Sequence, residues 1–244
     1  DDMSDQAASL MRELANETPD LYTNEILHMI AEQQQKRAEE SFEPIEPRSL
    51  AAILTNGPPS NIDDLKSLIV EELDEAQRKL LGDELDQVRD FWNDSGVPYP
   101  ENRCRDRLAA IIDTRLADMY SVRRMTEADM PKDKRADLAF ATGPTMQLPL
   151  EAKGQWHADV WDAASSQLES KYLIDWRCEG RGVYCVFWFG ELASATGRRL
   201  KAHPDGLRPP KTATEMRSML IDRIPPQRRP FIDVVVVDLA TGRK

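Results

Sequence analysis

Apolar residues recur every three or four positions in several stretches of the chain, a spacing that predicts amphipathic helices. The first predicted helix begins after Asn61, a residue that can cap a helix, and ends at Gly82. Its apolar stripe consists of Ile62, Leu65, Ile69, Leu73, Ala76 and Leu80. Similar patterns predict further helices over residues 101–119, 157–172 and 212–224.

Shorter apolar runs predict strands. Residues 136–141 and 148–153 flank a Gly-Pro turn and predict a hairpin. Residues 182–190 and 231–239 are rich in aromatic and β-branched residues, as is typical of buried strands. A further strand is predicted over 120–126. Strands that alternate with helices in this order predict an α/β fold, in which helices cover both faces of the sheet.

Charge divides the chain into two parts. The formal net charge of the 244 residues is -11. Residues 1–98 hold 8 Lys and Arg against 23 Asp and Glu, a net charge of −15, whereas residues 99–244 hold 24 against 20, a net charge of +4. We therefore expect an acidic, all-α N-terminal appendage or connector over 1–98, with a Pro-rich linker at 42–60, and an α/β domain over 99–244.

Composition excludes several classes of protein. The sequence has no run of about eighteen apolar residues, so neither a membrane-spanning helix nor a membrane partner is expected. Three cysteines without a CxxC pair favour a reducing, cytoplasmic compartment. The three histidines lack the spacing of a zinc site, and the P-loop, GxGxxG and GxSxG motifs are absent.

The predicted hairpin brings two carboxylates together. If its strands pair around the Gly-Pro turn, Asp137 and Glu151 lie opposite each other with Cβ atoms about 5 Å apart. Lys153 comes two residues after Glu151 and therefore lies on the same face. Opposed carboxylates repel, so they need a shared proton, a cation or a metal ion, and oxygen ligands suit Mg²⁺. The alternative is a plain surface ion pair between Glu151 and Lys153.

These acidic and basic residues resemble a known motif. The sequences Arg-Ala-Asp at 135–137 and Leu-Glu-Ala-Lys at 150–153 fall on the second and third strands of the predicted α/β domain. In this position they resemble the motif of the PD-(D/E)xK nuclease superfamily. The resemblance covers residues 100–240 and implies a restriction-endonuclease-like core, in which helices flank a mixed central sheet.

The resemblance also implies a metal site. Asp137, Glu151 and the backbone carbonyl of Ala152 would bind Mg²⁺ or Mn²⁺. Lys153 would assist the attacking water and stabilise the negative charge that develops on the phosphate. Many members of the superfamily add an acid from the first helix, and here Glu101 is the preferred candidate.

Further candidates lie on the helices. Asp106 competes with Glu101 for the role of the added acid, and an acid at a helix start such as Glu101 is otherwise a favourable dipole interaction. In exonuclease-like members a Gln on the second helix approaches the site, and a Tyr follows four residues later. Gln167 fits the first part of that pattern, but position 171 is Lys, which favours an endonuclease. The alternative for Gln167 is a place on a solvated polar helix face. His157 is a candidate phosphate contact or accessory acid, or else a polar residue at a helix N-terminus.

A basic stretch follows the buried strand at 182–190. Residues 198–229 hold nine Lys and Arg against three Asp and Glu, a net charge of +6. Such a cluster suits contact with the phosphate backbone of a nucleic acid, and an ordinary solvated loop is the alternative. The candidate nucleic-acid-binding residues are His157, Arg198, Arg199, Lys201, Arg208 and Lys211.

These patterns together predict a divalent-metal-dependent nuclease that hydrolyses phosphodiester bonds, with double-stranded DNA as the favoured substrate. Segments at 104–108, 134–137 and 186–190 also resemble nuclease effector modules of bacterial antiviral defence proteins. That resemblance implies a sensor or NTPase region or subunit as a partner, and the superfamily implies a homo-oligomer. The alternatives are a nuclease-fold module that binds nucleic acid without cutting it, and a helical interaction module of a larger assembly.

Overall fold

The structure is a computed structural model. It describes residues 57–82, 87–130, 134–173 and 175–240, together with residues 28, 29, 32 and 36. The Pro-rich linker predicted over 42–60 lies outside these residues apart from its last four positions. Within the described part of the chain, no helix is long and apolar enough to cross a membrane.

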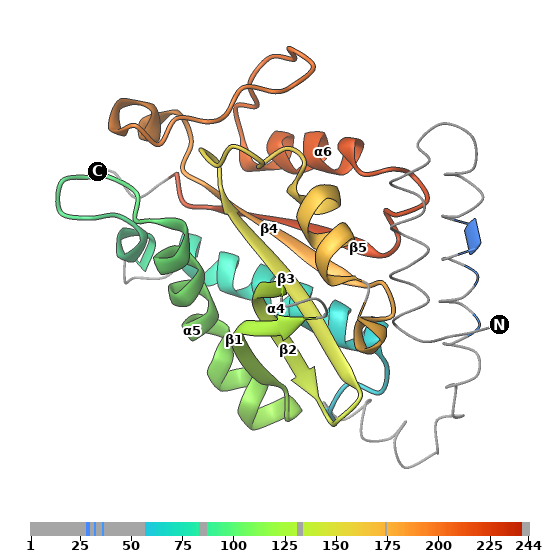
Figure 1. Ribbon diagram of the computed structural model, residues 1–244. Coiled ribbons are helices and arrows are strands. Elements are labelled where there is room, and N and C mark those ends of the chain that lie inside the picture. Colours follow the sequence, from blue (N-terminus) through green and yellow to red (C-terminus); the bar gives the residue numbers. More distant parts are fainter. Residues whose placement is uncertain are drawn as a thin grey trace.

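A five-stranded mixed sheet forms the centre of the molecule, and its strands lie side by side in chain order (Figure 1). The strands are β1 (Arg123–Met130), β2 (Lys134–Thr142), β3 (Met146–Gly154), β4 (Gly182–Trp188) and β5 (Ile232–Asp238). β1, β2 and β3 form an antiparallel meander, whereas β4 runs parallel to β3 and β5 parallel to β4. The predicted α/β fold with a mixed central sheet is therefore confirmed.

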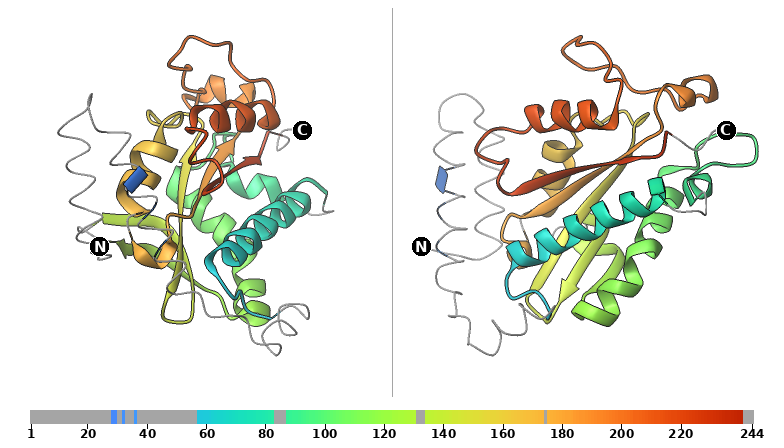
Figure 2. Two further views of the ribbon diagram at one scale, coloured as in Figure 1. Left: turned by 90° about the vertical axis from the view of Figure 1, so that its right-hand side faces the viewer. Right: turned by 180° about the vertical axis from the view of Figure 1, so that it is seen from behind.

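Helices cover both faces of this sheet (Figure 2). Helices α4 (Ile62–Gly82) and α5 (Glu101–Tyr120) pack on one face. The π-helix η3 (Ala164–Tyr172) and helix α6 (Ala213–Arg223) pack on the other. The described chain also contains the short 3₁₀ helices η1 (Gln87–Phe91), η4 (Trp176–Cys178) and η5 (Glu191–Thr196).

Strand β4 shows why the sheet is buried on both sides. Because successive strand residues point to opposite faces, its side chains alternate between the two hydrophobic clusters. Those that pack with α4 and α5 are Val183, Cys185 and Phe187. Those that pack with η3 and α6 are Tyr184, Val186 and Trp188. A strand buried on both faces needs a continuous apolar run, which is the pattern that predicted it.

The predicted hairpin forms with the predicted register. Leu138 pairs with Leu150, as pairing around the Gly-Pro turn requires. The strand predicted over 120–126 begins later, at Arg123. The reason is that helix α5 continues until Ser121 closes it in the left-handed region, with a φ of 54°.

The helix predicted over 157–172 begins only at Ala164 and has π geometry. Turns replace its first part. The backbone N–H of His157 donates to the Gly154 carbonyl at 2.9 Å, and the N–H of Asp159 donates to His157 Nδ1 at 3.1 Å. These local bonds satisfy backbone groups that a helix would otherwise use.

Helix α4 lies before the predicted boundary at residue 98, but it shares one hydrophobic core with the sheet (Figure 2, right). The residues of its predicted apolar stripe are all buried. Lys66 Nζ pairs with Asp233 at 3.0 Å, and Gln77 bonds to the backbone of Asp238. Helix α4, which falls within the predicted all-α appendage, therefore packs as part of the α/β core.

Candidate functional site

The candidate site lies where β2 and β3 stop pairing. Leu138 and Leu150 are the last paired residues, and Asp137 and Glu151 come directly after them. The backbone N–H of Ala152 donates to Asp137 Oδ2 at 3.1 Å, so the aspartate side chain replaces a ladder partner. The N–H and C=O of one strand residue point to the same side of the strand, so the Ala152 carbonyl is also directed toward β2.

Three carboxylates converge on the ammonium of Lys153. Its Nζ lies 2.5 Å from Glu151 Oε1, 3.6 Å from Glu101 Oε1 and 3.7 Å from Asp137 Oδ2. We call Asp137, Glu151, Glu101 and Lys153 the carboxylate cluster. The two residues that the hairpin geometry placed on one face, Glu151 and Lys153, are thus in direct contact.

Glu151 and Lys153 lie on the face of the sheet that η3 and α6 cover. They are in register with Tyr184 and Val186 of β4, whose side chains pack on that face. Glu151 is 1% exposed and Lys153 is 5% exposed. A charge buried to this degree is costly unless an opposite charge lies beside it, so each of the two residues depends on the other.

Glu101 is the acid from the first helix that joins the cluster. The backbone N–H of Gly154 donates to Glu101 Oε2 at 2.7 Å. The competing acid, Asp106, is exposed and pairs with Arg105 at 2.9 Å. Arg105 also reaches the cluster, because its Nη1 lies 3.6 Å from Asp137 Oδ1.

The environment of the cluster shifts its proton equilibria. Burial, together with the nearby Asp137 carboxylate and against the opposing effect of Lys153, raises the pKa of Glu151 to about 7. Burial alone would lower the pKa of Lys153, but the carboxylates of Glu151, Asp137 and Glu101 outweigh it and raise that pKa. Lys153 is therefore held as a charged ammonium, and Glu151 is close to the point where it takes up a proton.

The donor set of the cluster fits a hard divalent cation. Carboxylate oxygens are the ligands that Mg²⁺ and Mn²⁺ prefer. The Oε2 atom of Glu151 is buried and has no hydrogen-bond partner within the described chain. Among the described residues, no group of three His, Cys, Asp or Glu side chains is arranged so that it could hold a metal ion, and the three carboxylates of the cluster lie 2.5–3.7 Å from the Lys153 ammonium.

Gln167 and His157 do not contact the carboxylate cluster. Gln167 Nε2 donates to Asp159 Oδ2 at 2.9 Å. His157 accepts the backbone N–H of the same Asp159 and closes the turn before η3. His157 thus lies in the turns that precede η3.

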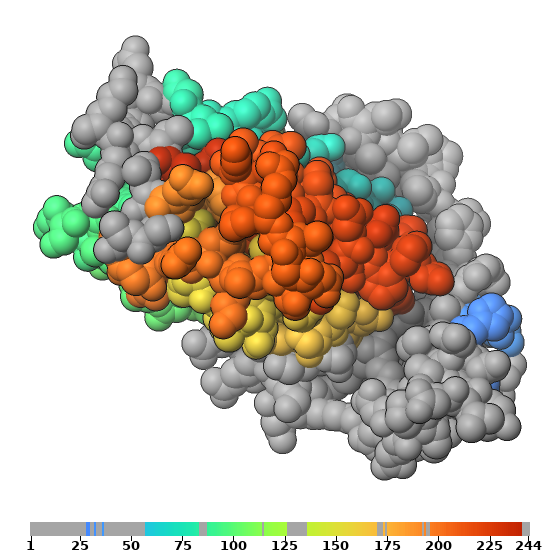
Figure 3. All heavy atoms as spheres, turned by 90° about the horizontal axis from the view of Figure 1, so that it is seen from above, coloured from blue at the N-terminus to red at the C-terminus, as the bar shows by residue number. Residues whose placement is uncertain are grey.

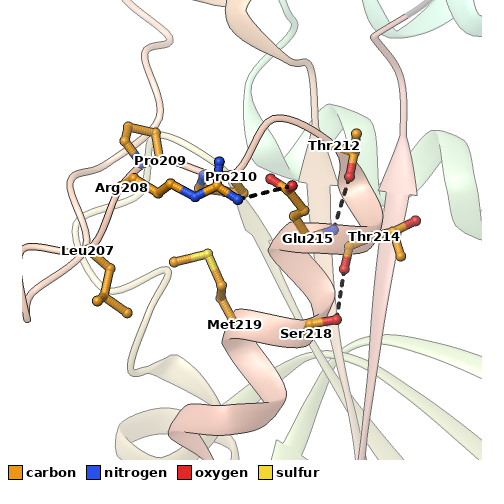
Figure 4. Close-up of a pocket in the computed structure, with 9 residues that line it drawn as sticks. All are labelled: Leu207, Arg208, Pro209, Pro210, Thr212, Thr214, Glu215, Ser218 and Met219. Carbon is orange, nitrogen blue, oxygen red and sulfur yellow. Dashed lines mark hydrogen bonds and ion pairs between the residues drawn. The ribbon is translucent and has the colours of Figure 1, made fainter.

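The basic segment, which we define as residues 198–211, lies at the surface beside α6 and faces the viewer in Figure 3. Arg208 pairs with Glu215 at 3.5 Å across a pocket between the segment and α6 (Figure 4). The backbone N–H of Lys211 donates to the same carboxylate at 2.7 Å. Arg199 and Lys201 are exposed and make no ion pair with any described residue.

The cations that follow the basic segment are mostly neutralised. They pair with acidic side chains from several parts of the chain: Arg223 with Asp162 and Asp205, Arg228 with Glu169, and Arg229 with Asp222. The positive charge predicted over 198–229 is thus concentrated in space near the start of the basic segment.

Two residues beside the cluster were not predicted from the sequence. Arg105 follows Glu101 by four positions on α5, so the two share a helix face, and this spacing is a signal that could have identified it. Gln155 follows Gly154 and is fully buried. No periodicity or motif marks a buried glutamine of this kind.

Comparison of the chain with protein-family models, with curated proteins and with solved structures found no match.

Proposed function

We propose that this chain is a divalent-metal-dependent nuclease that hydrolyses phosphodiester bonds of nucleic acid. The observation that carries the proposal is the convergence of three carboxylates on one buried lysine, with a buried Glu151 oxygen that lacks a partner in the described chain. Gathered carboxylates cost free energy through repulsion and lost hydration. A fold that keeps them together is better explained by function than by stability.

The order of the elements supports the proposal. Helix α5 is followed by the meander β1–β3, by η3, by the parallel strand β4, and then by α6 and β5. A restriction-endonuclease-like core of the PD-(D/E)xK superfamily would have this order. Asp137 and Glu151 lie on its second and third strands, where that superfamily would place them.

The proposed metal ligands are the carboxylates of Asp137, Glu151 and Glu101. The Ala152 carbonyl, which is directed toward the side of Asp137, would join them. When bound, Mg²⁺ or Mn²⁺ supplies a Lewis acid for the phosphate and lowers the pKa of a bound water. Because Lys153 now lies between the carboxylates, we expect its ammonium to withdraw from Glu151 Oε1 when the cation binds.

Lys153 would then act on the substrate as a charged donor. Its raised pKa favours the ammonium form, which orients the attacking water by hydrogen bonding and stabilises the negative charge of the transition state. The same raised pKa disfavours a role as general base. Arg105, whose Nη1 lies 3.6 Å from Asp137 Oδ1, would orient that carboxylate.

Nucleic acid is the proposed substrate because the basic segment, which carries exposed cations, is hydrogen-bonded to the chain directly after the carboxylate cluster. The backbone N–H of Lys201 donates at 3.0 Å to the carbonyl of Gln155, two residues after Lys153. Phosphate contacts of this kind give affinity without base specificity. Double-stranded DNA as substrate, endonucleolytic cutting, a homo-oligomer, a sensor or NTPase partner and a role in antiviral defence stay predictions.

A cutting assay with the whole chain tests the proposal. Supercoiled plasmid, single-stranded DNA and RNA are incubated with Mg²⁺, with Mn²⁺ and with EDTA, beside Lys153→Ala and Asp137→Ala. We expect products only from the wild type and only with a divalent ion. Equal product from wild type and variants on every substrate would overturn the proposal. A wild type that binds DNA in a gel-shift assay but cuts nothing would support the non-cutting module instead.

A further inference from the structure

Gln155 lies at the end of β3, two residues after Lys153, and is fully buried. Its side-chain Nε2 donates to the carbonyl oxygens of Gly190, at 3.0 Å, and of Arg198, at 3.1 Å. Its Oε1 accepts the backbone N–H of Phe189 at 2.7 Å. A buried amide with three partners fixes its neighbours in place, because each of them would be left unsatisfied without it.

The backbone of Gln155 makes a second connection to the basic segment. Its carbonyl accepts the N–H of Lys201 at 3.0 Å, and its N–H donates to the Phe187 carbonyl at 3.1 Å. Residues 198–201 are thus bonded at both ends to one residue. These four residues form neither helix nor strand, so Gln155 sets their position relative to β3.

Trp156 supports the side chain of Arg198. The guanidinium carbon lies 4.5 Å from the centroid of the Trp156 ring. The same ring covers Gly154 so closely that an added Cβ there would lie 2.6 Å from it. Gly154 in turn donates its backbone N–H to Glu101 of the carboxylate cluster. Arg198 is therefore stacked beside the proposed metal site.

The guanidinium of Arg198 has no acidic partner among the described residues. Its central carbon lies over the Trp156 ring, and Arg198 makes no ion pair with any described residue. A guanidinium without an acidic partner can bind two oxygens of one phosphate through its N–H donors. The other arginine of the segment with a defined contact, Arg208, is neutralised by Glu215.

We propose that Arg198 binds a backbone phosphate of the substrate strand next to the cleaved bond, and that Gln155 is the positioning residue that holds Arg198 there. This inference rests on the nuclease function proposed above. The chemical class recognised is a phosphodiester of nucleic acid, bound through its oxygens. Gln155 itself does not touch the substrate and acts through the backbone of residues 198–201.

The loss of the phosphate contact is expected in KM rather than in kcat. Arg198→Ala raises the KM for duplex cleavage about tenfold or more, because it removes one charge-assisted contact. It also lowers the salt slope of duplex binding by about one. Arg198→Lys recovers only part of the affinity, because lysine keeps the charge but not the planar stack.

The positioning role of Gln155 is tested by its dependence on Arg198. Gln155→Met keeps a similar volume and removes the amide, so it raises KM in the wild-type background. In the Arg198→Ala background the same change adds no further increase. Independent, multiplying increases in the double variant would overturn the positioning role.

The experiment measures kcat and KM with Mg²⁺, and duplex binding in EDTA at several salt concentrations. Arg78→Ala, which removes an exposed arginine from α4, is the matched control. An unchanged KM and salt slope in Arg198→Ala, with a wild type that cuts, overturns this inference alone. A wild type that cuts nothing but binds DNA through Arg198 overturns the proposed function alone. A wild type that does neither overturns both. If circular dichroism shows Gln155→Met unfolded, the Arg198 variants still decide the phosphate contact.

Discussion

The carboxylate cluster and the basic segment carry opposite charges, and the protein holds them in different ways. The residues of the cluster belong to regular secondary structure: two of its carboxylates come from adjacent strands and the third from the first turn of α5. Its charges are gathered around one buried lysine in spite of their repulsion. The basic segment has an irregular backbone, and its side chains are mostly exposed.

The two regions also differ in how their charges are balanced by opposite charges. The strand register brings Asp137 and Glu151 together. Lys153 and Arg105 lie beside them and balance their negative charges. Along residues 198–229, by contrast, four of the seven arginines pair with acidic side chains, and Arg223 and Arg228 do so with Asp162 and Glu169 from outside the stretch. A count of charge along the sequence therefore overstates the positive field that the folded surface presents.

The largest expected effect is on the rate of cleavage, because we assign the chemical step to the carboxylate cluster and not to the basic segment. Asp137→Asn is expected to lower kcat about a thousandfold, because it removes a charge at the proposed metal. Asparagine can still accept the Ala152 N–H, so the circular dichroism spectrum stays unchanged. Single-turnover cleavage of plasmid measures the rate. A rate within about tenfold of wild type would place the chemistry elsewhere.

The next effect is on the pH dependence of the free energy of unfolding, to which the buried Glu151 contributes. The pKa of Glu151 is raised to about 7 from its ordinary value, so the folded state binds its proton more tightly than the unfolded state does. Its contribution to stability is complete below the unfolded pKa and is lost as the pH rises through about 7. Between pH 4.5 and 8 without metal, wild type should therefore lose about 3 kcal/mol relative to Glu151→Gln.

Urea unfolding of both proteins at a series of pH values measures this difference. Asp106→Asn is the matched control, because Asp106 is an exposed carboxylate outside the cluster. It should keep the pH dependence of the wild type. If the free energies of unfolding of wild type and Glu151→Gln change with pH in parallel, folding does not raise the pKa of Glu151.

A smaller effect links the cluster to its cation. Mg²⁺ at a hundred times its Kd should stabilise the folded chain by about 2.7 kcal/mol at pH 8. The gain should shrink at pH 6, because Glu151 is then mostly protonated and must release its proton to bind the ion. Thermal melts with and without Mg²⁺ report it. The same gain in stability at both pH values, or in Glu151→Gln, would show that Mg²⁺ binds at another site.

The smallest effect distinguishes cations within the basic segment. Lys201 makes no ion pair with a described residue, whereas Arg208 pairs with Glu215. Lys201→Ala should lower the salt slope of DNA binding by about one. Arg208→Ala should change it less, because its charge is already neutralised. Filter binding at several salt concentrations measures both slopes, and equal changes would mean that the ion pair does not matter for binding.

The parts of the site that follow from strand geometry could be predicted from the sequence. Side chains alternate along a strand and a short turn fixes the register, so Asp137, Glu151 and Lys153 fall together once the hairpin is identified. The resemblance implied an added acid from the first helix, with Glu101 preferred over Asp106, and Glu101 lies 3.6 Å from Lys153 Nζ. The α/β sheet covered by helices on both faces also followed from the order of apolar runs, whereas its mixed strand directions followed from the resemblance.

Contacts between distant segments could not be predicted. Gln155 binds carbonyls of Gly190 and Arg198, which lie 35 and 43 residues away, and a single buried amide has no periodicity. The stripe of α4 predicted a buried face, but it could not show that this face packs on the sheet. Gln167 was selected by resemblance alone, and its amide bonds to Asp159 instead of entering the cluster.

The most direct test of the proposed metal site is anomalous diffraction from a crystal grown with Mn²⁺. We predict one manganese peak in contact with the carboxylates of Asp137 and Glu151, with Lys153 Nζ withdrawn from Glu151 Oε1. A crystal without a peak at the cluster, at a Mn²⁺ concentration that supports DNA cleavage and with Lys153 still bound to Glu151, would contradict the account.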